Sequence, residues 1–494
     1  MRARILTLGW LILTGCPKVV PPAELPPVPL NAQQQLAKEV DAIAVEALAL
    51  TREQDELLWA HWTQGAALEL DKPALAHAVL YAPATLDRVR LAKKEGIGNA
   101  VGVKRLEKWL VGERLARATM EANATLAGQE ATATFDLDGK PTAWKDLSRL
   151  LANEKSAVKR RALWAASREA VPALAEGIKK RDDAVVAALA ALGMTPEEYA
   201  GVTLESVQAL AQKTLDSTDA EWKAGLTVLA KAELGLPLEK VTRADLPKLL
   251  RPSVAADAAF AKAEQAAKAA ALLGTLNLYG QPGLTLDLAE SAKKNPLPLT
   301  VAPNGAADVR VSVRPAGGVR DLSMALGEVG RGLAMHGSRE PAEKLPRLAD
   351  PLVADTTALL FAQLPSNAAW LKQQGVADEA AKPSLASSTA LQLFALRKTA
   401  AGLLTMIESR GQTPEFAAES YRAWSARALS IQVPLEDAPR FQLERDPLYR
   451  GVELLQSAEA VAALRSTLAP EWWSAPETTA KLREAWAGQL SSAP

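Results

Sequence analysis

A glutamate and an arginine three residues apart are the side chains of this chain best placed to do chemistry together. Glu328 and Arg331 lie in the segment DLSMALGEVGRGLAMHGS, residues 321–338. Residues three apart share one face of a helix, so a carboxylate and a guanidinium at this spacing can form an ion pair. Arginine keeps its proton in proteins and cannot donate a lone pair to a metal ion. The spacing therefore predicts a salt bridge and excludes Arg331 as a metal ligand.

The histidines limit which hydrolytic sites the chain can build. Only His61, His77 and His336 occur, and no two of them are four residues apart. A helical zinc site of the H-E-x-x-H type needs two such histidines on one helix face. No G-x-S-x-G segment occurs either, so the sequence does not indicate a serine hydrolase. Neither a conventional helical zinc site nor a serine triad is therefore predicted.

The segment 321–338 resembles the catalytic helix of the thimet oligopeptidase and oligoendopeptidase F family of zinc peptidases. In that family the motif H-E-x-G-H supplies two zinc ligands and the glutamate that activates water. Here the matching frame, residues 327–331, reads Gly-Glu-Val-Gly-Arg, so the glutamate and the second glycine are kept while both histidines are replaced. The resemblance extends, patchily, over four further segments: 134–166, 284–303, 361–367 and 446–486.

The resemblance also implies that the third zinc ligand is lost. The segment 361–367 resembles the family segment that carries a ligand glutamate, and Gln363 stands at that position. A neutral amide is a poor zinc ligand compared with a carboxylate. Gly327, Arg331 and Gln363 are thus implied to be former ligand positions, with Glu328 a remnant of the general base. We expect no bound zinc and no other cofactor.

Two readings of Arg331 follow from these losses. In the first, its guanidinium occupies the space and charge of the lost zinc, with Glu328 and Gln363 as hydrogen-bond partners. In the second, Arg331 points into a water-filled cleft. The glycines at 327, 330 and 332 each cost about 1 kcal/mol relative to alanine inside a helix. They therefore predict the close approach of another element, whereas a phosphate loop lacks its Lys-Ser/Thr.

A predicted strand precedes this helix. Val309, Val311 and Val313 alternate with polar residues, and Ala-Gly-Gly at 316–318 indicates a turn. In the family a strand in this place lies at a sheet edge and pairs with the substrate. The resemblance implies the same role here, and such β-augmentation needs no metal. The family's closing helices carry a histidine and tyrosines that stabilise the oxyanion, whereas this chain has only Tyr449 there.

The N-terminus predicts a lipoprotein. Arg2 and Arg4 precede nine apolar residues, and Leu-Thr-Gly-Cys at 13–16 fits a bacterial lipobox. We predict a signal peptide over 1–15, lipidation of Cys16, and an extended, proline-rich tether over 16–33. The predicted location is the cell envelope, with the chain lipid-anchored to the outer membrane and facing the periplasm. A plain secretory signal, or a buried cysteine, is the alternative.

Composition predicts a mainly α body. Lys plus Arg and Asp plus Glu both total 57 of 494 residues, so no net charge favours nucleic acid. Alanine-rich stretches carry apolar residues at helical spacing, as in 36–50 and 254–273. We expect a body over 34–494, divided into an N-terminal lobe (34–200) and a degenerate catalytic lobe (201–494). The resemblance implies a large two-lobed helical ellipsoid with a deep cleft and a small edge sheet, like neurolysin and oligoendopeptidases.

Three functions remain open at this point. The first is a membrane-anchored, catalytically inactive peptidase body that binds a peptide or protein partner in its cleft. The second is an active metallopeptidase with a displaced site, using ligands such as His336 with Asp350 or Asp355. The third is an envelope scaffold whose cleft is filled by side chains.

Overall fold

The computed structural model describes residues 30–252, 257–338 and 351–489. Helix accounts for 74% and strand for 4%, which confirms the mainly α prediction. The predicted signal peptide, Cys16 and most of the tether lie outside the described residues. Helix α1 already begins at Leu30, so the last four residues of the predicted 16–33 tether are helical.

The N-terminal part of the chain is a run of helices with one hairpin. Its elements are α1 (Leu30–Gln64), α2 (Asp71–Ala76), α3 (Pro83–Lys94), α4 (Ala100–Ala118), α5 (Met120–Thr132), β1 (Thr134–Leu137), β2 (Lys140–Ala143), α6 (Leu147–Asn153), α7 (Ala157–Ala166), α8 (Val171–Ala191) and α9 (Pro196–Ala200).

The remainder contains a small sheet enclosed by helices. Its elements are α10 (Leu204–Leu229), α11 (Leu246–Leu249), α13 (Gln265–Thr275), β3 (Leu284–Asp287), β4 (Leu299–Val301), β5 (Pro303–Ala306), β6 (Val309–Ser312), α14 (Val319–Gly337), α15 (Pro351–Ala362), α16 (Ala368–Gln373), α17 (Asp378–Glu408), α18 (Pro414–Leu429), α19 (Phe441–Glu444), α20 (Leu448–Thr467) and α21 (Thr478–Glu484).

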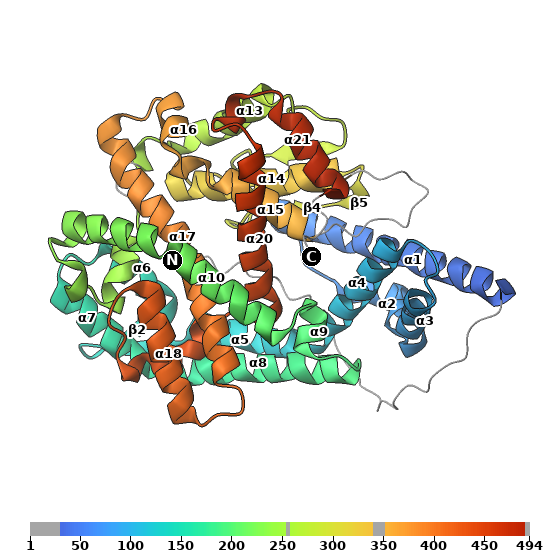
Figure 1. Cartoon of the computed structure of the whole chain (residues 1–494), viewed down its shortest axis with the longest axis horizontal. Helices are drawn as coiled ribbons and strands as arrows, with labels where there is room; N and C mark the ends of the chain where they lie inside the picture. The colour runs from blue at the N-terminus through green and yellow to red at the C-terminus, as the bar shows by residue number, and fades with distance from the viewer. Residues whose placement is uncertain (1–29, 253–256, 339–350, 490–494) are drawn as a thin grey trace.

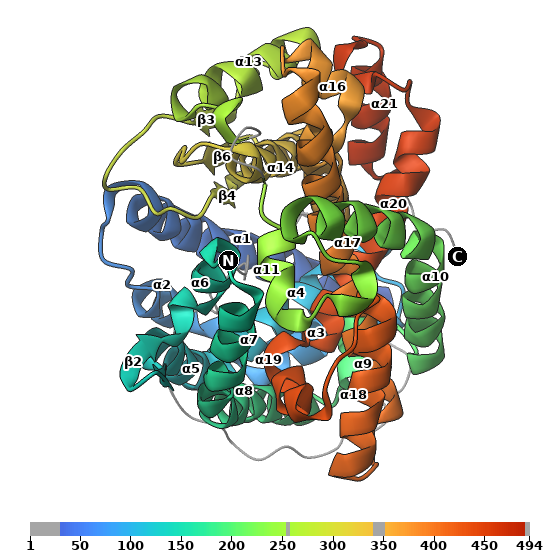
Figure 2. The same ribbon diagram turned by 90° about the vertical axis from the view of Figure 1, so that its left-hand side faces the viewer.

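Two views show how these elements are arranged. In Figures 1 and 2, α13, α14, α16, α21 and the sheet lie in the upper part, whereas α5, α8 and α18 lie in the lower part. α19, from near the C-terminus, packs against α8. Elements from both sides of the predicted 200/201 boundary therefore meet in the lower part.

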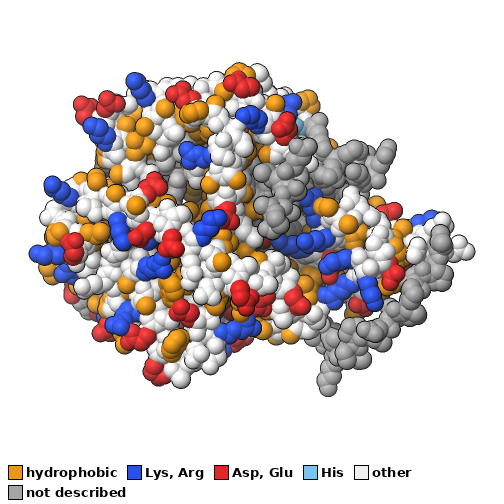
Figure 3. All heavy atoms as spheres, viewed as in Figure 1, with side chains coloured by type: hydrophobic (Ala, Val, Ile, Leu, Met, Phe, Trp, Pro, Cys, Tyr) orange, Lys and Arg blue, Asp and Glu red, His pale blue; other side chains and the backbone are white. Residues whose placement is uncertain are grey.

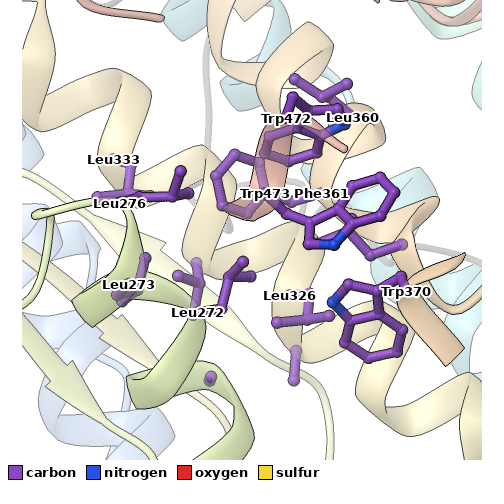
Figure 4. Packing of buried hydrophobic residues seen from close by; sticks show 14 of the residues in the cluster. Leu272, Leu273, Leu276, Leu326, Leu333, Leu360, Phe361, Trp370, Trp472 and Trp473 are labelled. Carbon is purple, nitrogen blue, oxygen red and sulfur yellow. The ribbon is translucent and has the colours of Figure 1, made fainter. Parts of the chain in front are cut away.

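The largest hydrophobic core surrounds α14 and α15. It joins leucines of α13 and α14 to aromatic side chains from the end of the chain. Figure 4 shows Phe361 beside Trp472, and their ring centroids are 5.1 Å apart. Trp472 and Trp473 are both buried. The two tryptophans thus pack the last helices onto α15, and their burial stabilises the contact.

Within the described residues, α17 is the helix that is long and apolar enough to cross a membrane by length and composition alone. Of its most apolar window, 44% is buried inside the protein. Helices in the cores of soluble proteins commonly satisfy the same criterion.

Candidate functional site

The N-terminus of α14 is fixed by two aspartates. Gly317 and Gly318 have φ values of 94° and 91°, which form the predicted turn without strain. The Asp321 carboxylate accepts hydrogen bonds from the backbone N–H groups of Ala316 (2.7 Å) and Gly317 (3.0 Å). Asp257 accepts another from the N–H of Val319 (3.1 Å). The bond to Val319 satisfies a donor that the helix start leaves free, and the two bonds to Asp321 hold the preceding turn against α14.

The glycines of α14 allow α15 and β6 to pack closely against the backbone of this helix. A Cβ at Gly330 would lie 2.8 Å from the Thr357 carbonyl oxygen, and one at Gly327 would lie 3.2 Å from the Cβ of Ala362. On another side, a Cβ at Gly332 would lie 2.4 Å from a methyl group of Val311 on β6. The predicted close approach is confirmed. A side chain at position 327 would require α15 to shift by a few tenths of an ångström.

Arg331 forms ion pairs with two carboxylates, one on each helix. Its guanidinium contacts Asp355 on α15, and its Nε lies 3.4 Å from Oε1 of Glu328 on α14. The side chains of Arg331, Glu328 and Asp355 are 29%, 16% and 24% exposed. Burial alone would lower the Arg331 pKa, but the two carboxylates raise it above its usual value. We call these three residues the Arg331 triad.

The predicted pairing of Arg331 with Gln363 is wrong. The side-chain oxygen of Gln363 accepts a hydrogen bond from Arg465 of α20 instead (3.2 Å). Asp355 lies within α15, and Gln363 directly follows this helix. Their separation of eight residues corresponds to about 12 Å along a helix. Only one of them can face Arg331, and the structure brings Asp355 there. The reading in which Arg331 points unpaired into a wet cleft is wrong as well.

The residues at the positions that the resemblance aligns with zinc ligands do not fit a zinc ion. Gly327 has no side-chain donor, and Arg331 places a permanent cation between the two nearest carboxylates. The proposed displaced ligand His336 is buried, and its Nδ1 lies 3.0 Å from the carbonyl oxygen of Ala306. Asp350 lies outside the described residues. Among those that are described, no three His, Cys, Asp or Glu side chains are grouped to hold a metal ion.

The predicted edge strand is central. Val309–Ser312 does form a strand, β6, but β6 pairs with β3 on one side and with β4 on the other. The β3 pairing is parallel and the β4 pairing antiparallel. Val309, Val311 and Val313 are buried, so none of them is available to a peptide. Alternation in the sequence identified the strand, but it carries no information about a strand's position in its sheet.

The hydrogen-bond register of β6 shows which residues face each neighbour. Val309 donates its N–H to the carbonyl of Gly283 (2.8 Å), and Val313 donates to the carbonyl of Asp287 (3.0 Å). Odd-numbered residues of β6 therefore bond to β3. Because backbone groups alternate in direction along a strand, the even-numbered residues of β6 bond to β4.

One residue of β4, Thr300, has backbone N–H and C=O groups that are not paired within the sheet. Arg310 and Ser312 of β6 lie opposite Val301 and Leu299 of β4, and these are the hydrogen-bonded pairs. The N–H and C=O of Thr300 must then point away from β6. Neither group has a hydrogen-bond partner among the described residues. β4, rather than β6, thus lies at the edge of the sheet. Its open part is Thr300 alone, because Pro298 has no N–H and the N–H of Ala302 bonds to Asp55 (2.9 Å).

This open edge lies beside the Arg331 triad. The hydroxyl of Thr300 donates to the backbone carbonyl of Glu328 (3.4 Å). A strand edge with unpaired N–H and C=O groups can accept an extended peptide. Thr300 therefore connects the edge of β4 to the helix that carries the triad.

α20 borders the triad on its other side. Arg450 of α20 pairs with Glu453 (3.1 Å) and lies over the ring of Tyr449, 5.4 Å from its centroid. Burial would lower the Arg450 pKa, but Glu453, Tyr449 and Asp355 raise it, so the charge of Asp355 reaches α20. The Tyr449 ring packs edge-on against Tyr199 (5.5 Å). Sequence reasoning gave no role to Arg450, because nothing local relates it to Asp355.

A buried carboxylate meets the far end of the β4 edge. Asp55 of α1 accepts a hydrogen bond from the N–H of Ala302 (2.9 Å), and its side chain is only 9% exposed. Its pKa is raised to about 7, chiefly by burial and also by Glu56 and Asp308, against the lowering effects of Ala302 and Arg310. Sequence reasoning missed Asp55, because its position in a helical pattern resembles that of any solvated acid.

Asp55 is expected to make stability depend on pH. The raised pKa means that folding favours the protonated form. This stabilisation is therefore complete below about pH 4 and is lost as the pH rises through about 7. The full shift corresponds to about 4 kcal/mol as an upper limit, and we expect about half of it. Asp55→Asn keeps an acceptor for Ala302 but cannot ionise. The free energy of unfolding of this variant, measured with denaturant relative to the parent, should therefore rise by about 2 kcal/mol from pH 4 to pH 8. Equal pH profiles for the two proteins would contradict this.

A small pocket lies away from the triad, between α17, α18 and α19, and its volume of about 10 Å³ is roughly the space of one water molecule. Arg243 and Glu444 form an ion pair in its wall (2.5 Å), and Tyr421 donates to the same carboxylate (3.0 Å). All three side chains are buried. The pocket is thus bordered by a network that joins helices and is separate from the β4 edge.

Acidic and basic side chains are interspersed over most of the face in Figure 3, as the equal totals of the two charges suggest.

Compared with known proteins, the chain matches no protein-family model and no curated protein.

Proposed function

We propose that this chain is a lipid-anchored, catalytically inactive relative of the zinc oligopeptidases that binds peptides along the open edge of β4. In this proposal Cys16 carries the lipid and the helical body stands off the envelope membrane. The Arg331 triad replaces the zinc site, and a peptide or unfolded protein segment is the partner.

The loss of hydrolysis is supported by the chemistry of the triad. A zinc peptidase needs a metal ion to lower the pKa of the attacking water. Arg331 brings positive charge to the same helix position, but it cannot coordinate water or take up its proton. Glu328, the residue that the resemblance assigns as general base, is engaged in an ion pair.

Peptide binding is supported by the one observation that carries the proposal. Thr300 presents an unpaired N–H and C=O on β4, and its side chain contacts the backbone of Glu328. A peptide in extended conformation supplies the complementary acceptor and donor, and this pairing requires no particular side chains. The edge of β4 could thus bind a peptide although the protein does not hydrolyse it.

Metal content is the first test. The purified full chain is incubated with zinc, freed of excess metal by dialysis and measured by elemental analysis. We expect less than about 0.1 zinc per chain, since Gly327 and Arg331 supply no ligand atoms. One tightly held zinc per chain would overturn the proposal and direct attention to a peptidase assay.

A variant with restored ligands provides the matched comparison. Gly327→His with Arg331→His places two imidazoles four residues apart, with Asp355 opposite them on α15. Zinc content should rise toward one per chain, at a cost in stability because the Cβ at 327 would lie 3.3 Å from the Ala358 carbonyl oxygen. A folded variant that still binds no zinc would show that this part of α14 does not correspond to a zinc site.

A further inference from the structure

The open edge of β4 is closed at one end by α1. The next outward-facing N–H after Thr300 belongs to Ala302, and it is already bonded to Asp55 (2.9 Å). α1 also reaches the other end of β4, where the Trp62 indole donates a hydrogen bond to the carbonyl of Leu297 (2.7 Å). A peptide that pairs with Thr300 therefore cannot continue past Ala302, and one of its ends must lie near Asp55.

The closed end carries excess negative charge. Arg310 binds Glu56 through two hydrogen bonds of 2.8 Å and also pairs with Asp308 (2.6 Å). The single cation Arg310 thus forms ion pairs with two carboxylates, and Asp55 is a third acid beside them. Oδ2 of Asp55 accepts from Ala302, whereas its Oδ1 has no hydrogen-bond partner among the described residues. Although Asp55 is only 9% exposed, this oxygen is not fully buried and remains an acceptor that a ligand can reach.

We propose that Asp55 binds the free N-terminal ammonium group of a peptide that pairs with Thr300 in antiparallel orientation. This inference rests on the function proposed above and names the class of ligand: chains with an unblocked N-terminus. An antiparallel peptide has its N-terminal end next to the C-terminal end of β4, which is where Ala302 and Asp55 lie. The ammonium supplies the missing donor to Oδ1 and a positive charge to a cluster of three acids and one arginine.

The ion pair between the Asp55 carboxylate and the peptide ammonium should depend on pH in a distinctive way. Asp55 must be ionised, and its pKa in the free protein is about 7 under the influence of burial, Glu56, Asp308 and Arg310. The peptide amine must be protonated, and its pKa is about 8. The preference for free N-termini should consequently be strongest near pH 7–8 and decline at both pH 5 and pH 10.

A competition experiment tests this directly. The full chain is mixed with an equimolar library of nonapeptides, half with a free N-terminus and half with the same sequences N-acetylated, and bound peptides are quantified by mass spectrometry. At pH 7.5 we expect free peptides to be enriched about tenfold over acetylated ones, corresponding to about 1.4 kcal/mol. Asp55→Asn should reduce this ratio to about one. Glu290→Gln, which removes an exposed carboxylate beyond the β3 side of the sheet, should leave it unchanged.

The outcomes separate the two proposals. If free and acetylated peptides are retained equally by the parent chain, the role of Asp55 is overturned while peptide binding stands. If the parent chain retains no peptide of either kind, the proposed function fails as well. A tenfold preference that persists in Asp55→Asn would place the ammonium site elsewhere. The acetylation ratio of the parent chain needs no variant, so it remains decisive even if Asp55→Asn folds poorly.

Discussion

Replacing Gly330 by leucine is expected to lower the free energy of unfolding by about 3 kcal/mol. Even the first added carbon, the Cβ, would lie 2.8 Å from the Thr357 carbonyl oxygen and 3.0 Å from the Cβ of Phe361. Both neighbours belong to α15, and Phe361 is fully buried against Trp472. Neither can move without opening the largest core. Chemical denaturation followed by circular dichroism measures the loss.

Alanine substitutions at two glycines give the control for this result. Gly225 lies inside α10, and a Cβ there would meet nothing within 4 Å. Gly225→Ala should therefore stabilise the chain by up to about 1 kcal/mol through helix propensity alone. Gly330→Ala should destabilise it by about 2 kcal/mol in spite of the same propensity gain. Equal effects at the two sites would mean that α14 and α15 do not approach as closely as described.

Replacing Arg331 by alanine is expected to cost about 2–3 kcal/mol of stability. The substitution leaves Glu328 and Asp355, both mostly buried, without their shared cation. Breaking a fully buried ion pair costs 3–5 kcal/mol, and partial exposure reduces that cost here. The double substitution Arg331→Met with Asp355→Leu removes the facing charge as well, so it should recover at least half of the loss. Thermal and denaturant unfolding both report the difference.

A surface pair provides the comparison for Arg331. Lys179 and Asp183 are four residues apart on α8, and both side chains are about two-thirds exposed. Lys179→Ala should change stability by no more than about 0.5 kcal/mol. If Arg331→Ala has an effect equally small, the triad is a solvated surface cluster and does not substitute for a metal ion.

Features that depend on near neighbours along the chain could be predicted from the residues alone. Apolar residues at helical spacing produced a mainly α body, and alternating valines produced β6. The i,i+3 spacing of Glu328 and Arg331 predicted their ion pair, since a helix brings those positions together whatever surrounds it. The glycines of α14 predicted a close neighbour, because only a packing requirement explains their cost in a helix.

Which distant residues meet these local features depends on how the helices and strands pack against one another. Asp355 faces Arg331 and Gln363 does not, because the rotation and position of α15 against α14 select one face of it. β6 lies in the centre of its sheet because β3 pairs with it on one side and β4 on the other, and alternation is the same in central and edge strands. Asp55 closes the β4 edge from α1, nearly 250 residues away in the sequence. Such contacts depend on how whole elements dock, and residue spacing within an element carries no information about that.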